Sequence, residues 1–209
     1  MTAEPGSLPA YRIVTPRLVV RCWEPADAPL MKQAIESSIE HLLPWMPWAS
    51  AEPEELQKKI DLLRHFRGQF DLGVDFVYGI FDRDETAVIG GTGLHTRVGE
   101  GAREIGYWIR VAEIGKGYAT EAASALTRVG FELEKLRRIE IHCDAANVRS
   151  ASVPRKLGYT HEATLRRRIP GRDSDRDQMV WTMLIDEYPG SPASQVPVAA
   201  FDVIGREIE

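Results

Sequence analysis

One stretch of the chain, residues 105–136, constrains the fold most because it changes from strand to helix periodicity across a glycine-containing turn. Apolar residues alternate over 105–111, which is the pattern of a strand. Over 118–136 they recur at the three-and-four spacing of a helix. The turn contains Gly115 and Gly117, and a residue without a Cβ atom permits a sharp bend and close approach of a ligand. We therefore predict a strand–turn–helix unit with room for a ligand at its turn.

This turn has the properties of an anion site. The first backbone amides of a helix have no partner within the helix and lie at the positive end of its dipole. Lys116 adds a positive charge. Two common phosphate motifs do not fit, because Lys116 is followed by Gly117 instead of Ser or Thr, and Thr120 stands where a dinucleotide loop has its third glycine. From the glycine pair alone, a strand-to-helix turn without a ligand is an equal alternative.

Four motifs occur in the order and spacing of the GNAT superfamily of acyl-CoA N-acyltransferases, which this chain resembles: GYWI at 106–109, GKGYATEA at 115–122, NVRS at 147–150 and RKLGY at 155–159. The segments TPRLVVR at 15–21 and LPWMPWA at 43–49 look like the ribosomal-protein-alanine N-acetyltransferase (Rim-type) branch. The resemblance covers about residues 10–187. The family's loop usually has Gln or Arg where this chain has Ala112, but both glycines match, so we expect the backbone cradle to be kept.

The resemblance implies an α/β (α+β) fold in a single GNAT-like domain, with a mixed, mostly antiparallel, twisted sheet flanked by helices and opened around the cofactor. A chain of 209 residues is long enough for one domain with a sizeable core. We place that domain at 10–187 and a C-terminal extension at 188–209, where Pro, Gly, Ser and Ala become frequent. Periodicity predicts helices at 27–40, 53–70, 118–136 and 150–157, and strands at 12–21, 76–81, 87–95, 103–111, 138–143, 159–168 and 178–185.

Two predicted strands contain residues that disturb a sheet. Pro16 removes a ladder donor, so the 12–21 segment should be broken there or lie at an edge. Gly90, Gly91 and Gly93 suggest a bulge or a close backbone neighbour in the 87–95 strand.

Composition narrows the class of protein. The net charge of −5 argues against a general nucleic-acid binder, and there is no apolar run of the length that spans a membrane. The first residues lack the basic and apolar regions of a signal peptide. Cys22 and Cys143 have no metal-ligand spacing and no disulfide framework. We expect both to be reduced and buried, in a cytoplasmic protein.

The resemblance implies that acetyl-CoA (coenzyme A) is the cofactor. The strand residues Ile109, Arg110 and Val111 match the family segment whose backbone pairs with the pantetheine arm. By the same resemblance, Asn147 contacts that arm. The residues expected to hold the pyrophosphate are Ile114, Gly115, Lys116, Gly117, Tyr118, Ala119 and Thr120.

Acetyl transfer to an amine requires a base for the ammonium proton and an acid for the leaving thiolate. Glu104 is the predicted base, because many family members carry one at about this point of the strand, and by alternation it shares a face with Gly106 and Trp108. An exposed or paired structural glutamate is the alternative. His142 is the second candidate, since imidazole suits proton transfer near neutral pH. The family's usual tyrosine acid is replaced by Pro154. The resemblance instead places Ser150 near the cofactor sulfur, where it could act as the acid, and Ser150 is also a good helix N-cap.

The acceptor site is predicted from two loops. Trp45 and Trp48 lie between prolines, and the resemblance places this segment along the acceptor groove, although tryptophans on such loops also serve as core plugs. His142 and Asp173 are further candidates for contact with the acceptor. The 169–177 connection is expected to be a solvated hairpin tip. If it borders the groove instead, its aspartates would hold a cationic substrate.

These expectations combine into an acetyl-CoA-dependent N-acetyltransferase that transfers the acetyl group directly to a primary amine. The preferred acceptor is a protein or peptide N-terminal amine. The alternatives are an acetyltransferase for a small amine, such as a polyamine, amino sugar or antibiotic, and a CoA-binding sensor without turnover. We expect no metal, no membrane and no direct nucleic-acid contact, and a homodimer is possible.

Overall fold

The computed structural model describes residues 9–171 and 174–209. Their strands are β1 (Arg12–Val14), β2 (Leu18–Cys22), β3 (Phe76–Asp82), β4 (Val88–His95), β5 (Ala102–Ile109), β6 (Arg138–Asp144), β7 (Thr160–Ile169), β8 (Arg176–Leu184), β9 (Ala199–Phe201) and β10 (Glu207–Ile208). The helices are α1 (Ala28–Glu36), α2 (Ile39–Leu42), α3 (Leu56–Asp71), α4 (Tyr118–Arg128) and α5 (Val148–Leu157). Shorter helical turns cover Pro25–Asp27, Pro47–Ala51, Val111–Glu113, Val129–Leu133, Tyr188–Gly190 and Pro192–Gln195.

The described strands form one sheet in the order β10-β9-β1-β2-β3-β4-β5-β6-β8-β7. Every neighbouring pair is antiparallel except β5 and β6. That parallel pair is joined only over Ala102–Glu104 and Arg138–Glu140, so the two strands separate beyond Glu104. The predicted fold class, a mixed and mostly antiparallel sheet flanked by helices, is confirmed.

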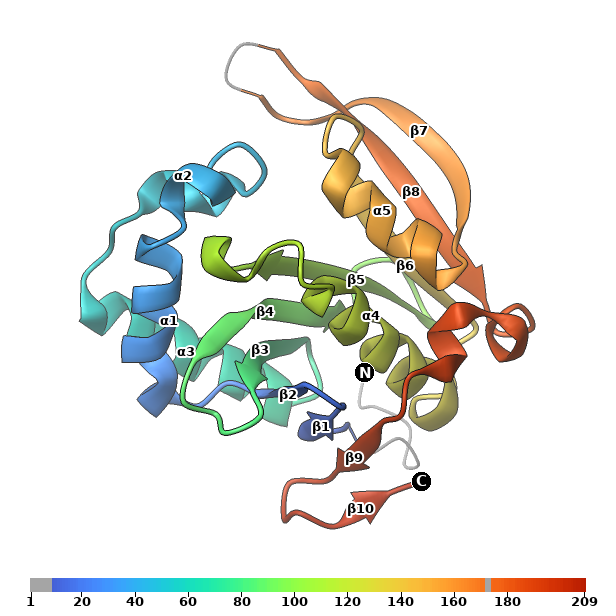
Figure 1. Ribbon diagram of the computed structural model, residues 1–209, viewed down its shortest axis with the longest axis horizontal. Helices are drawn as coiled ribbons and strands as arrows, with labels where there is room; N and C mark the ends of the chain where they lie inside the picture. The colour runs from blue at the N-terminus through green and yellow to red at the C-terminus, as the bar shows by residue number, and fades with distance from the viewer. Residues whose placement is uncertain (1–8, 172–173) are drawn as a thin grey trace.

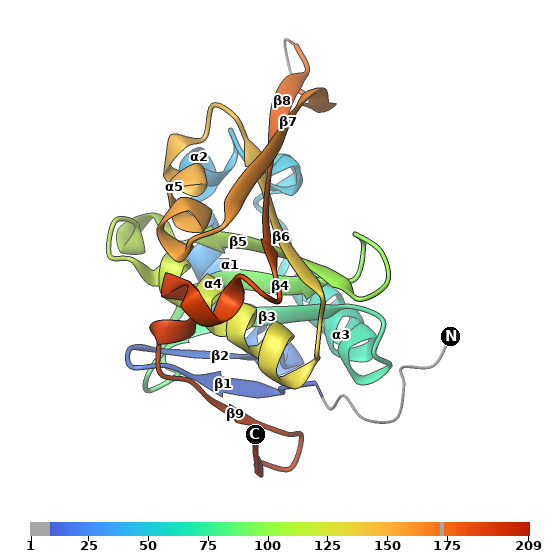
Figure 2. The same cartoon turned by 90° about the vertical axis from the view of Figure 1, so that its right-hand side faces the viewer.

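Helices cover both faces of the sheet, as Figures 1 and 2 show. On one face, α4 packs through a row of fully buried small and apolar residues, and α5 lies beside it. The alanines of α4 bring the helix axis close to the strands because their side chains are short. On the other face, α1 and α3 enclose a second core around Trp23 and Phe81.

The predicted strands are confirmed in order, and both predicted disturbances are present. The 12–21 segment is a strand pair interrupted around Pro16, with Val14 opposite Val19. The β3–β4 pairing shifts register between Ile80 and Phe81, opposite the glycine-rich start of β4.

Three predicted helices differ from the observed ones. The 27–40 helix breaks into α1 and α2, because Ser38 Oγ donates to the Ala34 carbonyl at 2.7 Å and competes with the helix ladder. The 53–70 helix begins only at Leu56. The 118–136 helix ends as α4 at Arg128 and continues as a π-helical turn, Val129–Leu133.

The C-terminal segment is part of the same sheet. In the tail, β9 pairs with β1, placing Ala200 opposite Ile13, and β10 pairs with β9. Ala193 and Ala200 are buried in the core that contains α4. The domain limit at residue 187 stays a prediction, since the sheet continues past it.

Within residues 9–171 and 174–209, every helix falls short of the length and apolar character that crossing a membrane requires.

Candidate active site

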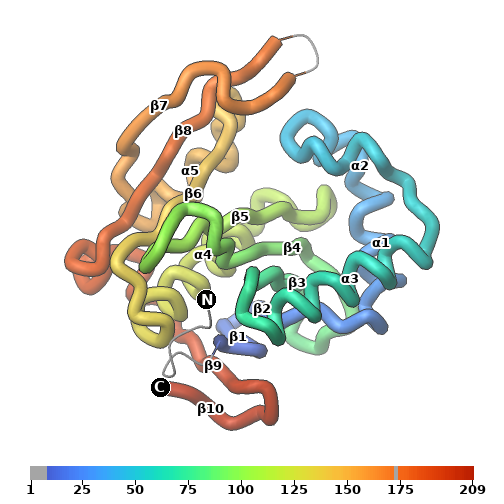
Figure 3. Tube along the Cα trace, turned by 180° about the vertical axis from the view of Figure 1, so that it is seen from behind, coloured from blue at the N-terminus to red at the C-terminus, as the bar shows by residue number. Residues whose placement is uncertain are grey.

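The separation of β5 from β6 opens a groove of about 870 Å³. Its walls come from the segment after α2, from α3, from the exposed face of β4–β6 and from the start of α5. Figure 3 shows α2 on one side of the molecule and the strands β7 and β8 on the other. Arg176 of β8 donates to the Pro44 carbonyl at 2.7 Å and so connects the two sides.

The glycine turn lies at the start of α4 and is open to a ligand. Gly115 and Gly117 have φ angles of 77° and 84°, in the left-handed region that favours glycine. A Cβ atom on Gly115 would have no atom of the described residues within 4 Å. The N-cap of α4 is Gly117, which offers no side chain to the first helical amides. Those amides therefore fit a diphosphate, which is the chemistry that the sequence predicted for this turn.

Arg17 holds the turn in place and was not identified from the sequence. Its guanidinium donates to the Lys116 carbonyl at 2.8 Å and to Glu121 of α4 at 2.6 Å. Thr15 donates to the same carboxylate at 2.6 Å, and Glu121 is buried. Lys116 itself is half exposed and pairs with Glu113 at 2.7 Å. The only sequence signal for this contact is the TPR segment at 15–17. It lies far from the 115–117 turn along the chain, so the sequence does not reveal that the two are in contact.

The backbone of β5 presents its free edge to the gap. The Arg110 N–H donates to the Ile89 carbonyl on the β4 side, and the Val111 N–H donates to Ser38 Oγ at 3.0 Å. Because backbone groups alternate sides along a strand, those of Tyr107 and Ile109 point towards β6. Of the three predicted pantetheine residues, Ile109 is thus the one whose backbone faces the gap.

Ser150 lies at the start of α5 beside two other groups that could handle a proton. The Tyr107 hydroxyl donates to the Ser150 carbonyl, and the two hydroxyl oxygens are 3.1 Å apart. Burial raises the pKa of Tyr107, so its hydroxyl keeps its proton near neutrality. Asn147 is the N-cap of α5, because its side chain accepts the Ser150 N–H at 3.0 Å. The cap role that the sequence offered for Ser150 therefore belongs to Asn147.

Cys143, at the end of β6, is a buried free thiol. Burial raises the pKa of Cys143 more than its hydrogen bonds to Trp181 and Ser150 lower it. The thiol is therefore neutral at physiological pH and a poor nucleophile. Cys22 is also free and buried, as predicted.

Glu104, the predicted base, is buried in the groove and paired with Arg97. The two side chains form a two-pronged ion pair, with Arg97 Nε and Nη2 at 2.7 and 2.6 Å from the two carboxylate oxygens. Burial raises the pKa of Glu104, but the hydrogen bonds and charge of Arg97 outweigh it, so the pKa is lowered. A lowered pKa makes the carboxylate a weaker base than an exposed glutamate. Its assignment as the base stays a prediction.

His142 lies on the same face but is turned towards carboxylates. Its Nε2 is 2.6 Å from Glu140 and its Nδ1 is 3.5 Å from Glu104. Neither ring nitrogen is directed at open space.

His95, at the end of β4, was not selected from the sequence. Its Nδ1 lies 2.8 Å from Asp75 Oδ2, while Asp75 Oδ1 accepts the Thr96 N–H. Both residues line the groove beside Glu104. The signal that could have found them is the β3–β4 hairpin, because pairing Phe76 with Leu94 places Asp75 opposite His95.

The two predicted acceptor tryptophans line the groove. Trp48 packs edge to face against Trp108 of β5, with ring centroids 6.0 Å apart, and Trp45 lies beneath Arg176. Trp48 is 40% exposed, so it forms part of a wall instead of a core plug. Asp173, the remaining acceptor candidate, lies outside the described residues.

The groove wall carries an excess of negative charge. Glu52, Glu54, Asp75, Glu104 and Asp144 all line it, with Lys59 and Arg97 as the permanent cations. Lys59 is buried between Glu52 and Glu54. Asp144 pairs with Arg176 at 2.6 Å, which leaves four carboxylates facing two cations.

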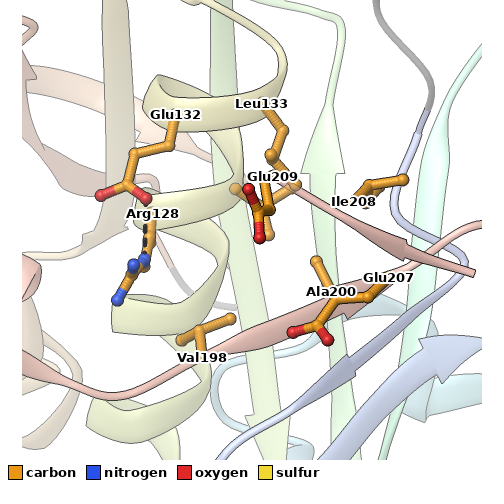
Figure 4. Close-up of a pocket in the computed structure, with 9 residues that line it drawn as sticks. Arg128, Glu132, Leu133, Val198, Ala200, Glu207, Ile208 and Glu209 are labelled. Carbon is orange, nitrogen blue, oxygen red and sulfur yellow. Dashed lines mark hydrogen bonds and ion pairs between the residues drawn. The ribbon is translucent and has the colours of Figure 1, made fainter.

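A second cavity of about 330 Å³ lies between the end of α4 and the tail strands. Figure 4 shows Arg128 and Glu132 on its helix side and Glu207 on its strand side. Arg128 and Glu132 pair with each other at 2.8 Å. None of the predicted site residues that the structure describes lines this cavity.

Comparison with known proteins gives one family and one fold. Residues 17–160 match the acetyltransferase (GNAT) domain family. The chain is 29% identical over 162 residues to the ribosomal protein uS5-alanine N-acetyltransferase of Escherichia coli (strain K12), which covers 75% of this chain and 82% of that protein. It is 33% identical over 106 residues to the uncharacterized N-acetyltransferase YnaD of Bacillus subtilis (strain 168), covering 51% of this chain and 62% of YnaD, which is less than two thirds of its length. Among solved structures, RimL, a ribosomal L7/L12 alpha-N-protein acetyltransferase in complex with coenzyme A, has a TM-score of 0.76 at 19% identity, covering 83% of this chain and 97% of that chain. This last likeness shows a shared fold.

Proposed function

The chain belongs to the GNAT family of acetyl-CoA-dependent N-acetyltransferases, and we propose that it acetylates the N-terminal amine of a protein or peptide by direct transfer. The observation that carries the choice of acceptor is the groove, which has a volume of about 870 Å³, is walled by Trp45 and Trp48, and is rich in carboxylates. An α-ammonium group on an extended chain fits such a wall by charge and shape. The similarity to a ribosomal-protein-alanine acetyltransferase supports the same acceptor class.

The turn at the start of α4 would hold the diphosphate of coenzyme A through the amides of residues 115–120. The fit rests on two features of this turn: the open space in front of Gly115 and the uncapped first turn of α4. The backbone edge of Ile109 and the Asn147 side chain would receive the pantetheine arm. When bound, acetyl-CoA supplies an activated acyl group as a thioester.

Ser150 would supply the proton that the departing thiolate needs. Its hydroxyl shares a hydrogen bond with the neutral Tyr107 hydroxyl at 3.1 Å, so Tyr107 can replace the proton that Ser150 gives up. Tyr107 thus supplies a second hydroxyl to a site that lacks the family's usual tyrosine, since Pro154 occupies that position. The neutral Cys143 thiol beside Ser150 supports direct transfer without an acyl-cysteine intermediate.

Glu104 and Arg97 would present a fixed pair of charges to the entering ammonium. An α-amine has a pKa of about 8, compared with about 10.4 for a lysine side chain, so it needs less help to lose its proton near neutral pH. This difference favours an N-terminal amine over a lysine side chain as the acceptor.

The experiment is a thiol-release assay with acetyl-CoA and a panel of amines. The panel holds short peptides with free N-termini, the same peptides with blocked N-termini, polyamines, amino sugars and amino acids. We expect free CoA to appear only with free N-terminal peptides, and mass spectrometry to place the acetyl group on the α-amine. Release with small amines alone would favour the small-amine alternative. Binding of CoA without release under any acceptor would favour a sensor.

We also propose a cytoplasmic location, which the two buried, unpaired cysteines support. A homodimer stays a prediction.

A further inference from the structure

We infer that His95, held in position by Asp75, accepts the proton that the acceptor amine loses, and that Glu104 does not. This inference rests on the proposed acetyl transfer and deepens it by assigning the base. His95 would be a catalytic residue, because its ring faces the space where the amine enters. Asp75 would be a positioning residue that acts through His95.

The hydrogen bond between the two residues fixes which ring nitrogen is free. Asp75 Oδ2 is 2.8 Å from His95 Nδ1. Burial raises the pKa of Asp75, but the bonds from His95 and from the Thr96 and Phe76 amides lower it further, so Asp75 is a carboxylate that only accepts. The proton therefore sits on Nδ1, and a neutral His95 exposes the lone pair of Nε2. Within the described part of the chain, Nε2 makes no hydrogen bond to the protein.

Two glycines, which carry no side chain, leave space for the His95 ring. Gly93 on β4 and Gly106 on β5 are paired across the sheet. A Cβ atom on Gly93 would lie 2.4 Å from His95 Nε2, and one on Gly106 would lie 3.5 Å from it. The ring therefore packs over Gly93 of β4, with Nε2 also close to Gly106 of β5. A larger residue at position 93 would displace the imidazole.

The other two candidates are already engaged. Both oxygens of Glu104 are held by Arg97, so a proton transferred to Glu104 would break a two-pronged ion pair whose carboxylate is buried. His142 directs its nitrogens at Glu140 and Glu104. His95 is the imidazole in the groove that combines an orienting carboxylate with a nitrogen facing open space.

The charges around His95 come from every neighbouring element. Asp75 precedes β3, Arg97 follows β4, and Glu104 and His142 extend from β5 and β6. Across the groove, the α3 side contributes Lys59 with Glu52 and Glu54. Among the described residues that line the groove, the carboxylates outnumber the permanent cations.

The ammonium gives one proton to His95 Nε2 and becomes an amine, whose nitrogen bonds to the thioester carbonyl carbon. The carbon–sulfur bond breaks, and the sulfur leaves with the electron pair and takes a proton from Ser150. As the amide forms, the nitrogen gives its second proton to the Ser150–Tyr107 hydroxyl pair, which restores the Ser150 hydroxyl. His95 returns its proton to solvent.

The test compares His95→Gln, Asp75→Asn and Glu104→Gln in the full chain, with acetyl-CoA and a peptide that the wild type acetylates. His65→Gln on the exposed side of α3 is the matched control. We expect His95→Gln to lower kcat/KM at pH 7 by about 10²–10⁴-fold, the usual range for a general base, while the Kd for CoA stays within twofold. The acid limb of the pH–rate profile should disappear in His95→Gln and persist in Glu104→Gln. Asp75→Asn should keep CoA binding. It should make the acid limb of the pH–rate profile less pronounced and move its midpoint to another pH.

A second measurement separates chemistry from misfolding. Above about pH 9 an α-amine is already neutral, so the loss of kcat/KM in His95→Gln relative to the wild type should be smaller there. The same loss should also be smaller with a weakly basic amine that is neutral at pH 7. An acid limb retained in His95→Gln, or one lost in Glu104→Gln, would overturn the inference while leaving acetyl transfer intact. Wild-type protein that binds CoA but releases none would instead refute the proposed function.

Discussion

At the scale of single residues, Gly115 and Gly205 allow the effect of backbone strain on stability to be measured apart from the effect of a blocked ligand site. The φ of Gly115, 77°, is nearly matched by that of Gly205 in the tail, at 81°, and a Cβ atom on either would have no atom of the described part of the chain within 4 Å. The two positions therefore share the same strain, but only Gly115 lies at the proposed diphosphate site.

We expect Gly115→Ala and Gly205→Ala to lower the free energy of unfolding by a similar amount, about 1–2 kcal/mol, because an alanine is strained at positive φ. Only Gly115→Ala should weaken CoA binding, by tenfold or more, measured by calorimetry. Equal CoA affinity in the two variants would show that the turn does not grip the cofactor.

At the scale of elements, the tail strand β9 completes the sheet beside β1. The pairing places Ala200 opposite Ile13, and both are buried. Further along the chain, β10 pairs only with β9 among the described strands. The contribution of β9 can therefore be measured apart from that of β10.

Deleting residues 196–209 should lower the free energy of unfolding by roughly 2–4 kcal/mol, because it removes several ladder hydrogen bonds and exposes apolar side chains. Deleting only 203–209, which removes β10, should cost less than half as much. Urea denaturation measures both. CoA affinity at low temperature should be unchanged, since the tail strands pair only with β1 and with each other among the described strands. Equal stability of the two deletions would mean that β9 contributes nothing.

At the scale of the whole molecule, Glu134 links stability to pH. Its carboxylate is buried, 3.3 Å from Arg103, and makes no hydrogen bond to any residue that the structure describes. Burial raises the pKa of Glu134 from 4.5 to about 7, and the charge of Arg103 opposes this only in part. Between these two values the folded protein binds more protons than the unfolded chain. The contribution of Glu134 to the free energy of unfolding is therefore most favourable below about pH 4.5. It is lost as the pH rises through about 7, where the buried carboxyl group becomes charged.

Glu134→Gln should remove this dependence, because glutamine does not ionise. At pH 8 we expect the variant to be more stable than the wild type by about 1–3 kcal/mol, with a difference that shrinks towards pH 5. Glu100→Gln, in an exposed turn, is the control and should leave the profile unchanged. Urea melts at several pH values provide the measurement, and a difference that grows towards acid pH would contradict the assignment.

The predictions from sequence succeeded where information is local. The strands, the interruption at Pro16 and the irregular start of β4 were identified because each depends on the conformational preferences of neighbouring residues. Helix ends were less accurate. The break after α1 depends on Ser38, whose hydroxyl also accepts a bond from the Val111 amide far along the chain.

The sequence by itself determined the turn at 115–117, because glycine's freedom at positive φ is a property of the residue. Only the tertiary structure decided how the charged groups in the groove are paired. Arg97 neutralises Glu104, and the β3–β4 register sets Asp75 against His95. A shift of that register by one residue would turn His95 to the other face of the sheet, so no local pattern could assign the proton's destination.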